Sequence, residues 1–143
     1  MIRLGRLFGV LALAVALALP AAAQTVGEGD RAAIEALIDG QIAAFRRDDG
    51  AAAYAMAAPA IQTIFPTVEQ FMSMVRSGYS PVYRPQSVVF GPLVETAQGP
   101  VQKVFLTGPD GLAYVAAYSL ERQADGSWKI SGCVLLRDDR PSI

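Results

Sequence analysis

The stretch Tyr79-Ser80-Pro81-Val82-Tyr83-Arg84-Pro85 separates two parts of the chain whose apolar residues recur with different periods. Before it, apolar residues recur at the three- and four-residue spacing of amphipathic helices. After it, they alternate as they do in strands. Because proline fixes φ and has no N–H to donate, we expect residues 79–85 to form an extended crossing between the two parts. Helices followed by strands predict an α+β fold.

Three helices are predicted before the crossing. The first begins at an N-cap, Asp30, and ends near Arg47. A short alanine-rich helix follows over residues 51–58 and stops before a proline. The third starts at Thr67-Val68-Glu69-Gln70, which matches the capping box, and ends near Arg76. The predicted apolar stripe of the first helix consists of Ile34, Leu37, Ile38, Ile42 and Phe45.

Four strands are predicted after the crossing, over about residues 87–95, 101–107, 112–121 and 127–137. Short glycine-containing turns connect them, and short connections imply antiparallel neighbours. Residues 112–118 carry no charge on either side-chain parity, whereas a strand with one wet face alternates apolar and polar residues. We therefore expect the third strand to be central and covered on both faces. The helices would cover one face, and a neighbouring strand, the N-terminal arm or a second subunit would cover the other.

The N-terminus has the three parts of a secretory signal peptide. Arg3 and Arg6 precede an apolar run from Leu7 to Leu19, and three alanines then supply a small-residue cleavage site. The run is shorter than the about 20 residues that span a bilayer, which argues against the alternative of a membrane anchor. We expect residues 1–23 to be a cleavable signal peptide. Residues 24–143 would then form a single exported domain, periplasmic or secreted, with no membrane attachment after cleavage.

The composition argues against several chemistries. The 143 residues contain no His and one Cys, so the commonest metal ligand and an internal disulfide are both missing. No metal site and no cofactor are predicted. Loss of Arg3 and Arg6 with the leader reduces the 12 Lys and Arg residues to 10, against 13 Asp and Glu residues, a net charge of −3. Such a chain has no electrostatic reason to bind nucleic acid.

The tyrosines are the strongest candidates for a ligand-binding site. Tyr114 and Tyr118 share parity on the predicted central strand, while Tyr79, Tyr83 and Arg84 lie on the crossing, where they could form a pocket rim. Together they could bind an apolar ligand with one anionic end, the rings stacking and Arg84 pairing with the charge. The alternative is ordinary core and rim packing with satisfied hydroxyls.

No catalytic residue is predicted. The Asp and Glu residues fall at helix caps, turns, strand ends, the polar face of the first helix and the tail, where most serve local backbone hydrogen bonding. Cys133 has no neighbouring cation in sequence to lower its pKa, which favours a small buried hydrophobe over a redox-active thiol. Gln41 falls on the apolar stripe of the first helix, where it either points into a cavity or holds a loop carbonyl.

Four stretches, residues 42–49, 71–79, 81–85 and 126–135, together span most of the predicted domain. In these stretches the chain resembles the domain of unknown function 4864 family, within the nuclear transport factor 2-like (SnoaL-like) superfamily. The resemblance implies three N-terminal helices packed on a strongly bent four-stranded antiparallel sheet, a cone-like shape with an apolar pocket, often in a homodimer. It implies no activity, because the family is defined by a domain of unknown function. Enzymes of the superfamily place Asp, His or Tyr in the cone, and because this sequence has no His, their catalytic roles cannot be carried over residue by residue.

These observations predict an exported bacterial protein that binds a small apolar ligand in a cone-shaped pocket without catalysis. One alternative is an isomerase- or cyclase-like enzyme that uses a tyrosine and a buried carboxylate, which requires a carboxyl group inside the pocket. The other is an interaction module that forms a homodimer through the sheet. A strict monomer with a polar outer sheet face would exclude this interpretation.

Overall fold

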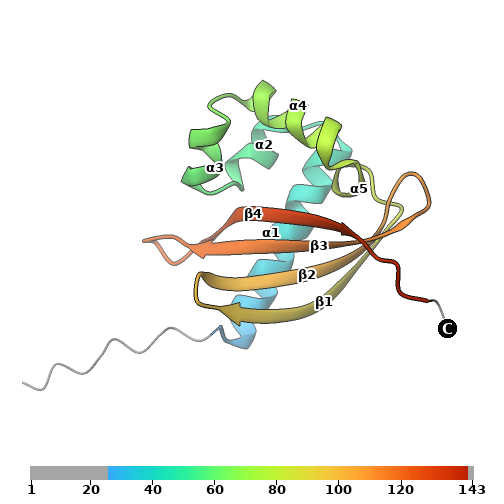
Figure 1. The fold of residues 1–143 in the computed structure, drawn as a ribbon. Helices are drawn as coiled ribbons and strands as arrows, with labels where there is room; N and C mark the ends of the chain where they lie inside the picture. The colour runs from blue at the N-terminus through green and yellow to red at the C-terminus, as the bar shows by residue number, and fades with distance from the viewer. Residues whose placement is uncertain (1–25, 142–143) are drawn as a thin grey trace, which may run out of the picture.

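The computed structural model describes residues 26–141, so the predicted signal peptide, residues 1–23, lies outside the described residues. Helices and strands follow each other as the sequence predicts, and the α+β fold is confirmed (Figure 1). The described part contains five helices rather than three. None of them has the length and apolarity that crossing a membrane requires. The elements are α1 (Glu28–Arg46), α2 (Gly50–Ala55), α3 (Pro59–Ile64), α4 (Val68–Gly78), α5 (Ser80–Tyr83), β1 (Ser87–Thr96), β2 (Gly99–Thr107), β3 (Ala113–Arg122) and β4 (Trp128–Arg137).

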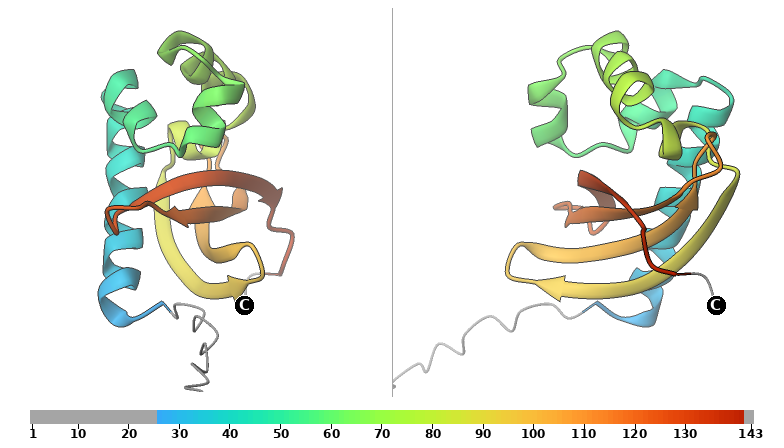
Figure 2. Two further views of the ribbon diagram at one scale, coloured as in Figure 1. Left: turned by 90° about the vertical axis from the view of Figure 1, so that its left-hand side faces the viewer. Right: turned by 45° about the vertical axis from the view of Figure 1, so that its right-hand side comes forward.

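The strands form one open antiparallel sheet in the order β1-β2-β3-β4, so β3 is central as predicted. Two register shifts interrupt the pairing, one between Phe90 and Leu93 in β1 and one between Ser119 and Leu120 in β3. Such irregularities bend a strand and increase its twist. The sheet accordingly curves beside α1, while α2, α3 and α4 lie at the β4 end of it (Figure 2).

The core forms where α1 packs against the inner face of the sheet. The predicted apolar stripe of α1 is buried at Ile34, Ile38, Ile42 and Phe45, and Leu37 is partly buried against the same cluster. Alternate residues of the central strands point to the same core. The buried residues of β2 and β3 in this cluster are Val104, Leu106, Ala116, Tyr118 and Leu120.

Of the two predicted N-caps, the one at Thr67 is confirmed and the one at Asp30 is wrong. Thr67 caps α4, because its Oγ1 accepts a hydrogen bond from the Gln70 N–H at 3.2 Å. Asp30, predicted as the N-cap of α1, lies in its first turn, and Gly27 occupies the N-cap position. The Asp30 carboxylate reaches back to accept from the Gly27 N–H at 3.2 Å. An acidic residue in the first turn thus satisfies a free N–H of the helix without being the cap itself.

The crossing is not extended as predicted. Ser80–Tyr83 forms a single helical turn, α5, with Pro81 in its first positions. Proline fits there because the first N–H groups of a helix have no intrahelical acceptor and because its fixed φ suits a helix. The second proline of the motif, Pro85, comes after the turn has ended and leads into β1.

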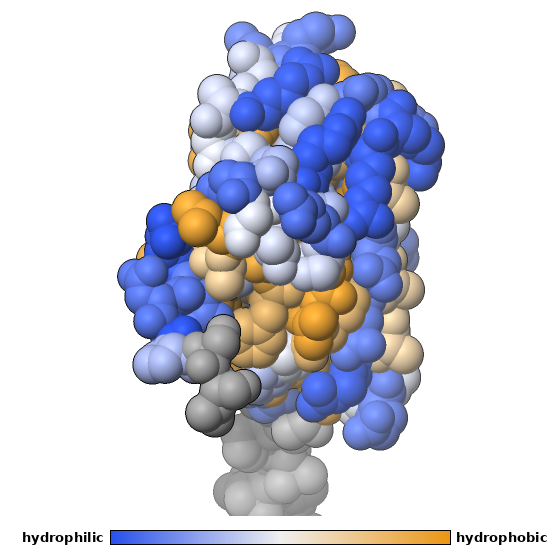
Figure 3. All heavy atoms as spheres, turned by 90° about the vertical axis from the view of Figure 1, so that its right-hand side faces the viewer, coloured by the Kyte–Doolittle hydropathy of each residue, from blue (hydrophilic) through white to orange (hydrophobic). Residues whose placement is uncertain are grey.

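The outer face of the sheet is not covered by the described residues. Val89, Val134 and Leu136 are 59%, 58% and 59% exposed. In the C-terminal tail, Arg140 lies over the ring of Phe105 with its Cζ 5.0 Å from the ring centroid. Apolar residues gather at the level of the strands in Figure 3, whereas the level of α4 is mostly hydrophilic. Of the covers expected for this face, the N-terminal arm before residue 26 lies outside the described residues, and a second subunit lies outside a single chain.

Candidate functional site

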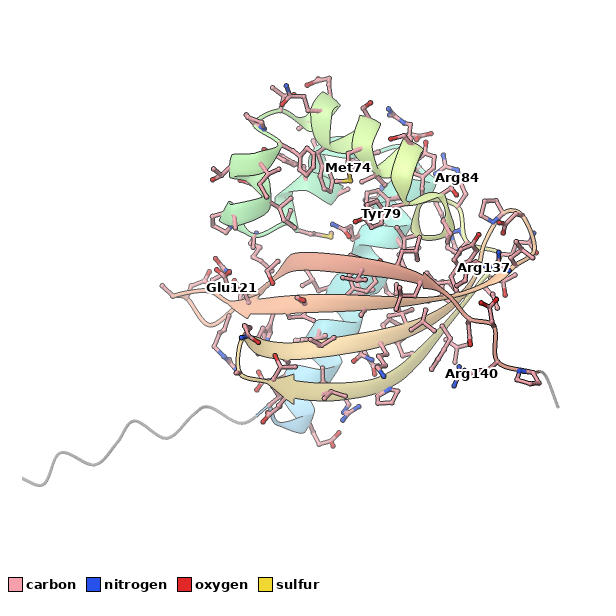
Figure 4. All side chains as sticks on the ribbon, in the orientation of Figure 1. Met74, Tyr79, Arg84, Glu121, Arg137 and Arg140 are labelled. Carbon is pink, nitrogen blue, oxygen red and sulfur yellow. The ribbon has the colours of Figure 1, made fainter. Side chains whose placement is uncertain are left out.

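A cavity of about 310 Å³ lies between the helices and the inner side of β3 and β4. Its size is at the lower end of the range for small-molecule sites. No charged side chain of the described residues lines it. In Figure 4, Met74 and Tyr79 reach from the helical side toward β4. The lining residues are Gln41, Phe45, Ile61, Ile64, Phe65, Phe71, Met74, Val75, Tyr79, Val82, Tyr118, Ile130, Ser131, Gly132 and Cys133.

Backbone bonds to the edge strand β4 hold the helical wall of the cavity in place. The N–H of Ala58, just before α3, donates to the Ile130 carbonyl at 2.8 Å, and the Ile130 N–H donates to the Met56 carbonyl at 2.9 Å. Farther along β4, the Tyr79 hydroxyl donates to the Cys133 carbonyl at 3.1 Å. The cavity is therefore bounded by a wall that is fixed to β4 at two places.

Tyr118 supplies the most unusual group in the cavity wall. The residue is 1% exposed, and no described residue forms a hydrogen bond with its hydroxyl. Burial raises the pKa of this hydroxyl well above its ordinary value, so the group stays protonated at neutral pH. A buried hydroxyl without a partner costs about 1–3 kcal/mol. Such a group needs an explanation, and a ligand is one.

Two further side chains of the wall, Gln41 and Cys133, are accounted for by the structure of the chain itself. Gln41 is 4% exposed and lines the cavity, while its Nε2 donates to the Ala53 carbonyl of α2 at 3.1 Å. Gln41 therefore lines the cavity, as one interpretation expected, and it holds a carbonyl of helix α2 rather than one of a loop. Burial raises the pKa of the Cys133 thiol to about 12, so it is protonated at neutral pH and lacks the thiolate of a redox-active site.

The family model described as a domain of unknown function (DUF4864) matches residues 28–143. The chain belongs to this family. The match includes every helix and strand described above, so the cavity lies within the DUF4864 domain. No curated protein and no solved structure matches the chain.

Of the five residues predicted to bind a ligand, two line the cavity of the DUF4864 domain, Tyr79 and Tyr118. The structure does not bring Tyr83 and Arg84 to it. The Arg84 guanidinium pairs with Asp48 at 2.9 Å between Nη2 and Oδ2, and lies 3.9 Å from the centroid of the Tyr83 ring. The Tyr83 hydroxyl also donates to Asp48. Through this hydrogen bond first, and through Arg84, the pKa of Asp48 is lowered.

This group of Tyr83, Arg84 and Asp48 fastens α5 to the end of α1. Arg84 also donates to the carbonyl of Phe45, one of the last residues of α1. Asp48 follows α1 with a positive φ of 54°, a conformation that Asp tolerates better than most residues. The predicted pairing of Arg84 with an anionic ligand would therefore have to compete with a carboxylate of the same chain.

Tyr114 lies at the start of β3, beside the turn from β2, and it does not line the cavity. Its hydroxyl donates to Asp110 Oδ2 at 2.7 Å, which raises the pKa of Tyr114 and lowers the pKa of Asp110. The Cζ of Arg137 lies over the Tyr114 ring, 5.6 Å from the centroid, and Arg137 marks this end of the sheet in Figure 4. Tyr114 thus has the satisfied hydroxyl that the alternative interpretation expected.

The sequence did not predict that α3 and α4 form a wall of the cavity. Ile61, Ile64 and Phe65 come from a segment without a helical period of its own, and Met74 and Val75 from α4. The available signal was the apolar character of residues 61–65, for which no packing partner was predicted. Among residues 26–141 no Asp or Glu is buried, and no cluster of His, Cys, Asp and Glu could hold a metal ion.

Proposed function

We propose that this DUF4864 domain binds a small, largely apolar molecule in the cavity between the helices and β4, without catalysing a reaction on it. One observation carries the proposal: Tyr118, whose buried hydroxyl has no partner among residues 26–141, lines an apolar cavity of about 310 Å³. Apolar lining with a few placed polar groups is typical of ligand pockets. A bound molecule would both fill the cavity and satisfy the hydroxyl.

The lining also bears on the enzymatic alternative. An isomerase- or cyclase-like reaction would need a carboxyl group inside the pocket as acid or base. No Asp or Glu lines the cavity, and none in the described part of the chain is buried. Tyr118 alone offers a neutral hydroxyl, which positions a ligand but has no base beside it. Binding therefore accounts for the cavity better than catalysis does.

Native mass spectrometry of the chain purified without detergent from the periplasm or medium of its bacterial host tests this function. We expect an added mass that dissociates on activation, and a polypeptide that begins at Gln24 because the signal peptide has been removed. Met74→Trp adds volume to the cavity wall and should abolish the added mass. Ala36→Trp, on the exposed side of α1, is the matched control and should retain it.

Two results would contradict these proposals separately. A well-folded wild-type chain with no added mass, or an added mass that Met74→Trp leaves unchanged, would argue against the cavity as the binding site. A polypeptide in the host that still carries residues 1–23 would contradict export with cleavage, whatever it binds.

A second proposal concerns the outer sheet face, where we propose that a second copy of this chain docks. Val89, Phe105, Val115 and Leu136 are partners in register and form one apolar row across all four strands of the described sheet. Exposed apolar rows of this kind mark interaction surfaces. An apolar surface is complementary to its own copy without matching charges, which suits a two-fold dimer.

Sedimentation at micromolar concentration tests the dimer. We expect the wild-type chain to sediment as a dimer and Leu136→Glu to be monomeric, since a buried charge would be unpaired at the interface. Ile64→Glu is the control, because Ile64 is 69% exposed but lies on α3. A strictly monomeric wild-type chain would rule out this proposal.

A further inference from the structure

The chemical class of the ligand can be inferred from the hydrogen-bonding groups of the cavity wall that have no partner within the chain. Tyr118 is the cross-strand partner of Cys133 on β4 and of Gln102 on β2. Gln102 is fully buried, and its Oε1 is the other buried side-chain atom of the described residues without a partner. The two unsatisfied groups are thus direct neighbours in register, and an internal pairing has to be considered first.

The amide of Gln102 instead forms hydrogen bonds with backbone carbonyls of β1 and β2. Its Nε2 donates to the Gly91 carbonyl at 2.8 Å and to the Lys103 carbonyl at 2.9 Å, which fixes the orientation of the amide. No hydrogen bond joins its Oε1 to the Tyr118 hydroxyl, and Gln102 does not line the cavity, whereas Tyr118 does. The hydroxyl of Tyr118 is therefore left without an internal partner, in a residue that lines the cavity.

The other polar groups of the wall differ from Tyr118 because they already donate. The Tyr79 hydroxyl is bonded to the Cys133 carbonyl, and the Gln41 amide to the Ala53 carbonyl. The thiol of Cys133 is a weak donor. Ser131 also lines the cavity, but it is only partly buried, so solvent can satisfy its hydroxyl. Tyr118 is therefore the fully buried strong donor of the wall without a partner, and a ligand that satisfies it has to bring an acceptor.

Charge and size restrict the ligand further. No charged side chain of the described residues lines the cavity, and Arg84, the cation expected from the sequence to meet an anionic ligand, is paired with Asp48 at 2.9 Å. An unpaired carboxylate in such a site would be costly. A dry cavity of about 150 Å³ holds benzene, so one of about 310 Å³ suits a molecule of about a dozen non-hydrogen atoms.

Building on the binding function proposed above, the geometry points to Tyr118 as the specificity-determining residue for an uncharged apolar ligand whose carbonyl or ether oxygen accepts the Tyr118 hydroxyl. This is narrower than an apolar pocket, which would accept any hydrophobic molecule that fits. It also differs from the anionic ligand expected from the sequence. A site built around a hydrogen bond discriminates strongly against an analogue that lacks the oxygen, because the buried hydroxyl then stays unpaired.

Three probes with one skeleton separate these possibilities: benzylacetone, a ketone; butylbenzene, a hydrocarbon; and hydrocinnamate, a carboxylate. Their affinities are measured by titration calorimetry with the wild-type chain, with Tyr118→Phe and with Tyr114→Phe. Phenylalanine keeps the ring and removes the hydroxyl. Tyr114→Phe is the matched control on the same strand, because that hydroxyl is bonded to Asp110 outside the cavity.

We expect Tyr118→Phe to weaken benzylacetone binding about tenfold, the equivalent of one hydrogen bond, and to leave butylbenzene binding unchanged or tighter. Tyr114→Phe should change neither affinity. Hydrocinnamate should bind the wild-type chain at least about tenfold more weakly than benzylacetone, since its charge has no partner in the cavity.

The possible failures are distinguishable. If both uncharged probes bind and Tyr118→Phe weakens neither, or both equally, the cavity binds ligands but Tyr118 does not select among them, and the inference is overturned. If hydrocinnamate binds as tightly as the ketone, the uncharged class is wrong. If no probe binds, the proposed binding function fails together with the inference.

Discussion

At the scale of single residues, Tyr118 and Gln102 stand out because each leaves a buried polar atom without a partner among the described residues. Folding removed both atoms from water, and nothing in residues 26–141 replaces the lost hydrogen bonds. Tyr114, four positions before Tyr118 on the same strand, satisfies its hydroxyl with Asp110. The same residue type thus has a satisfied hydroxyl at one position and a buried donor without a partner at the other.

The free hydroxyl predicts an unusual stability change. Without ligand, Tyr118→Phe should raise the free energy of unfolding by about 1 kcal/mol, because the ring packing is kept and an unpaired polar group is removed. Urea denaturation of the two purified chains measures the difference. Tyr114→Phe, which removes a satisfied hydroxyl, should not be stabilised. A loss of stability in Tyr118→Phe would show that the hydroxyl has a partner, such as a water shared with Gln102.

At the scale of helices and strands, predictability depended on the length of the repeating pattern. The four strands match their predicted ranges within two residues, and the stripe of α1 is buried as predicted. In contrast, α3 and α5 are too short for a period to emerge, and Pro81 is compatible with both an extended segment and the first turn of a helix. Both short helices border the cavity, so the sequence pattern was least informative beside the site.

The pairing of Tyr114 and Tyr118 shows a second limit. Alternation correctly predicts that the two side chains share a face of β3, but it cannot say what lies opposite each of them. Tyr118 faces the cavity wall, whereas Tyr114 meets the turn that contains Asp110. Arg84 likewise meets Asp48, which comes from a distant part of the sequence. Which polar group finds an internal partner depends on tertiary contacts that no local pattern contains.

One contact between elements predicts a dependence of stability on pH. Asp30 of α1 accepts hydrogen bonds from Arg122 Nη2 at 2.9 Å and from Trp128 Nε1 at 3.2 Å, so it ties α1 to the β3–β4 hairpin. The hydrogen bond from Arg122, followed by that from the Gly27 N–H, lowers the pKa of Asp30. Its contribution to stability is complete above the ordinary value of 3.8 and is lost as the pH falls through the lowered pKa of the folded state.

Asp30→Asn should therefore be less stable than the wild-type chain at neutral pH, and the difference should shrink as the pH falls below 3.8. Urea denaturation at a series of pH values measures both effects. Asp39→Asn is the control, since Asp39 is exposed on the same helix. A difference between Asp30→Asn and wild type that persists unchanged at low pH would mean that the carboxylate charge is not what joins the two elements.

At the scale of the whole molecule, packing differs between two parts of the chain. The sheet and α1 are well packed, whereas α3 makes few buried contacts. The inner faces of β2 and β3 and the stripe of α1 supply most of the buried core, whereas no residue of α3 is buried. Ile64, Phe65 and Met74 form a wall between the cavity and a shallow outer groove that includes Glu69 and Ser73. The cavity is itself partly open to the surface, since its lining residue Ile64 is 69% exposed.

Hydrogen exchange followed by mass spectrometry should reveal this division. Amides of β2, β3 and the middle of α1 should exchange slowest, near the rate set by global unfolding, and those of α3 should exchange much faster because few contacts break when it opens. A ligand in the cavity should slow exchange in α3 more than in β1. Equal protection of α3 and β3 without ligand would show that the whole domain opens as one unit.

The hydrogen bonds that hold the cavity wall also limit the pairing of the β4 edge with strands of other molecules. An open sheet has two free edges, and a free edge can recruit a strand of another molecule and start aggregation. Along β4, Ala57 bridges Ile130 in parallel and Tyr79 occupies the carbonyl of Cys133. Along β1, a register shift surrounds Pro92, which has no N–H to donate. Both edges are thereby poor templates for fibril growth, even though the face between them is apolar.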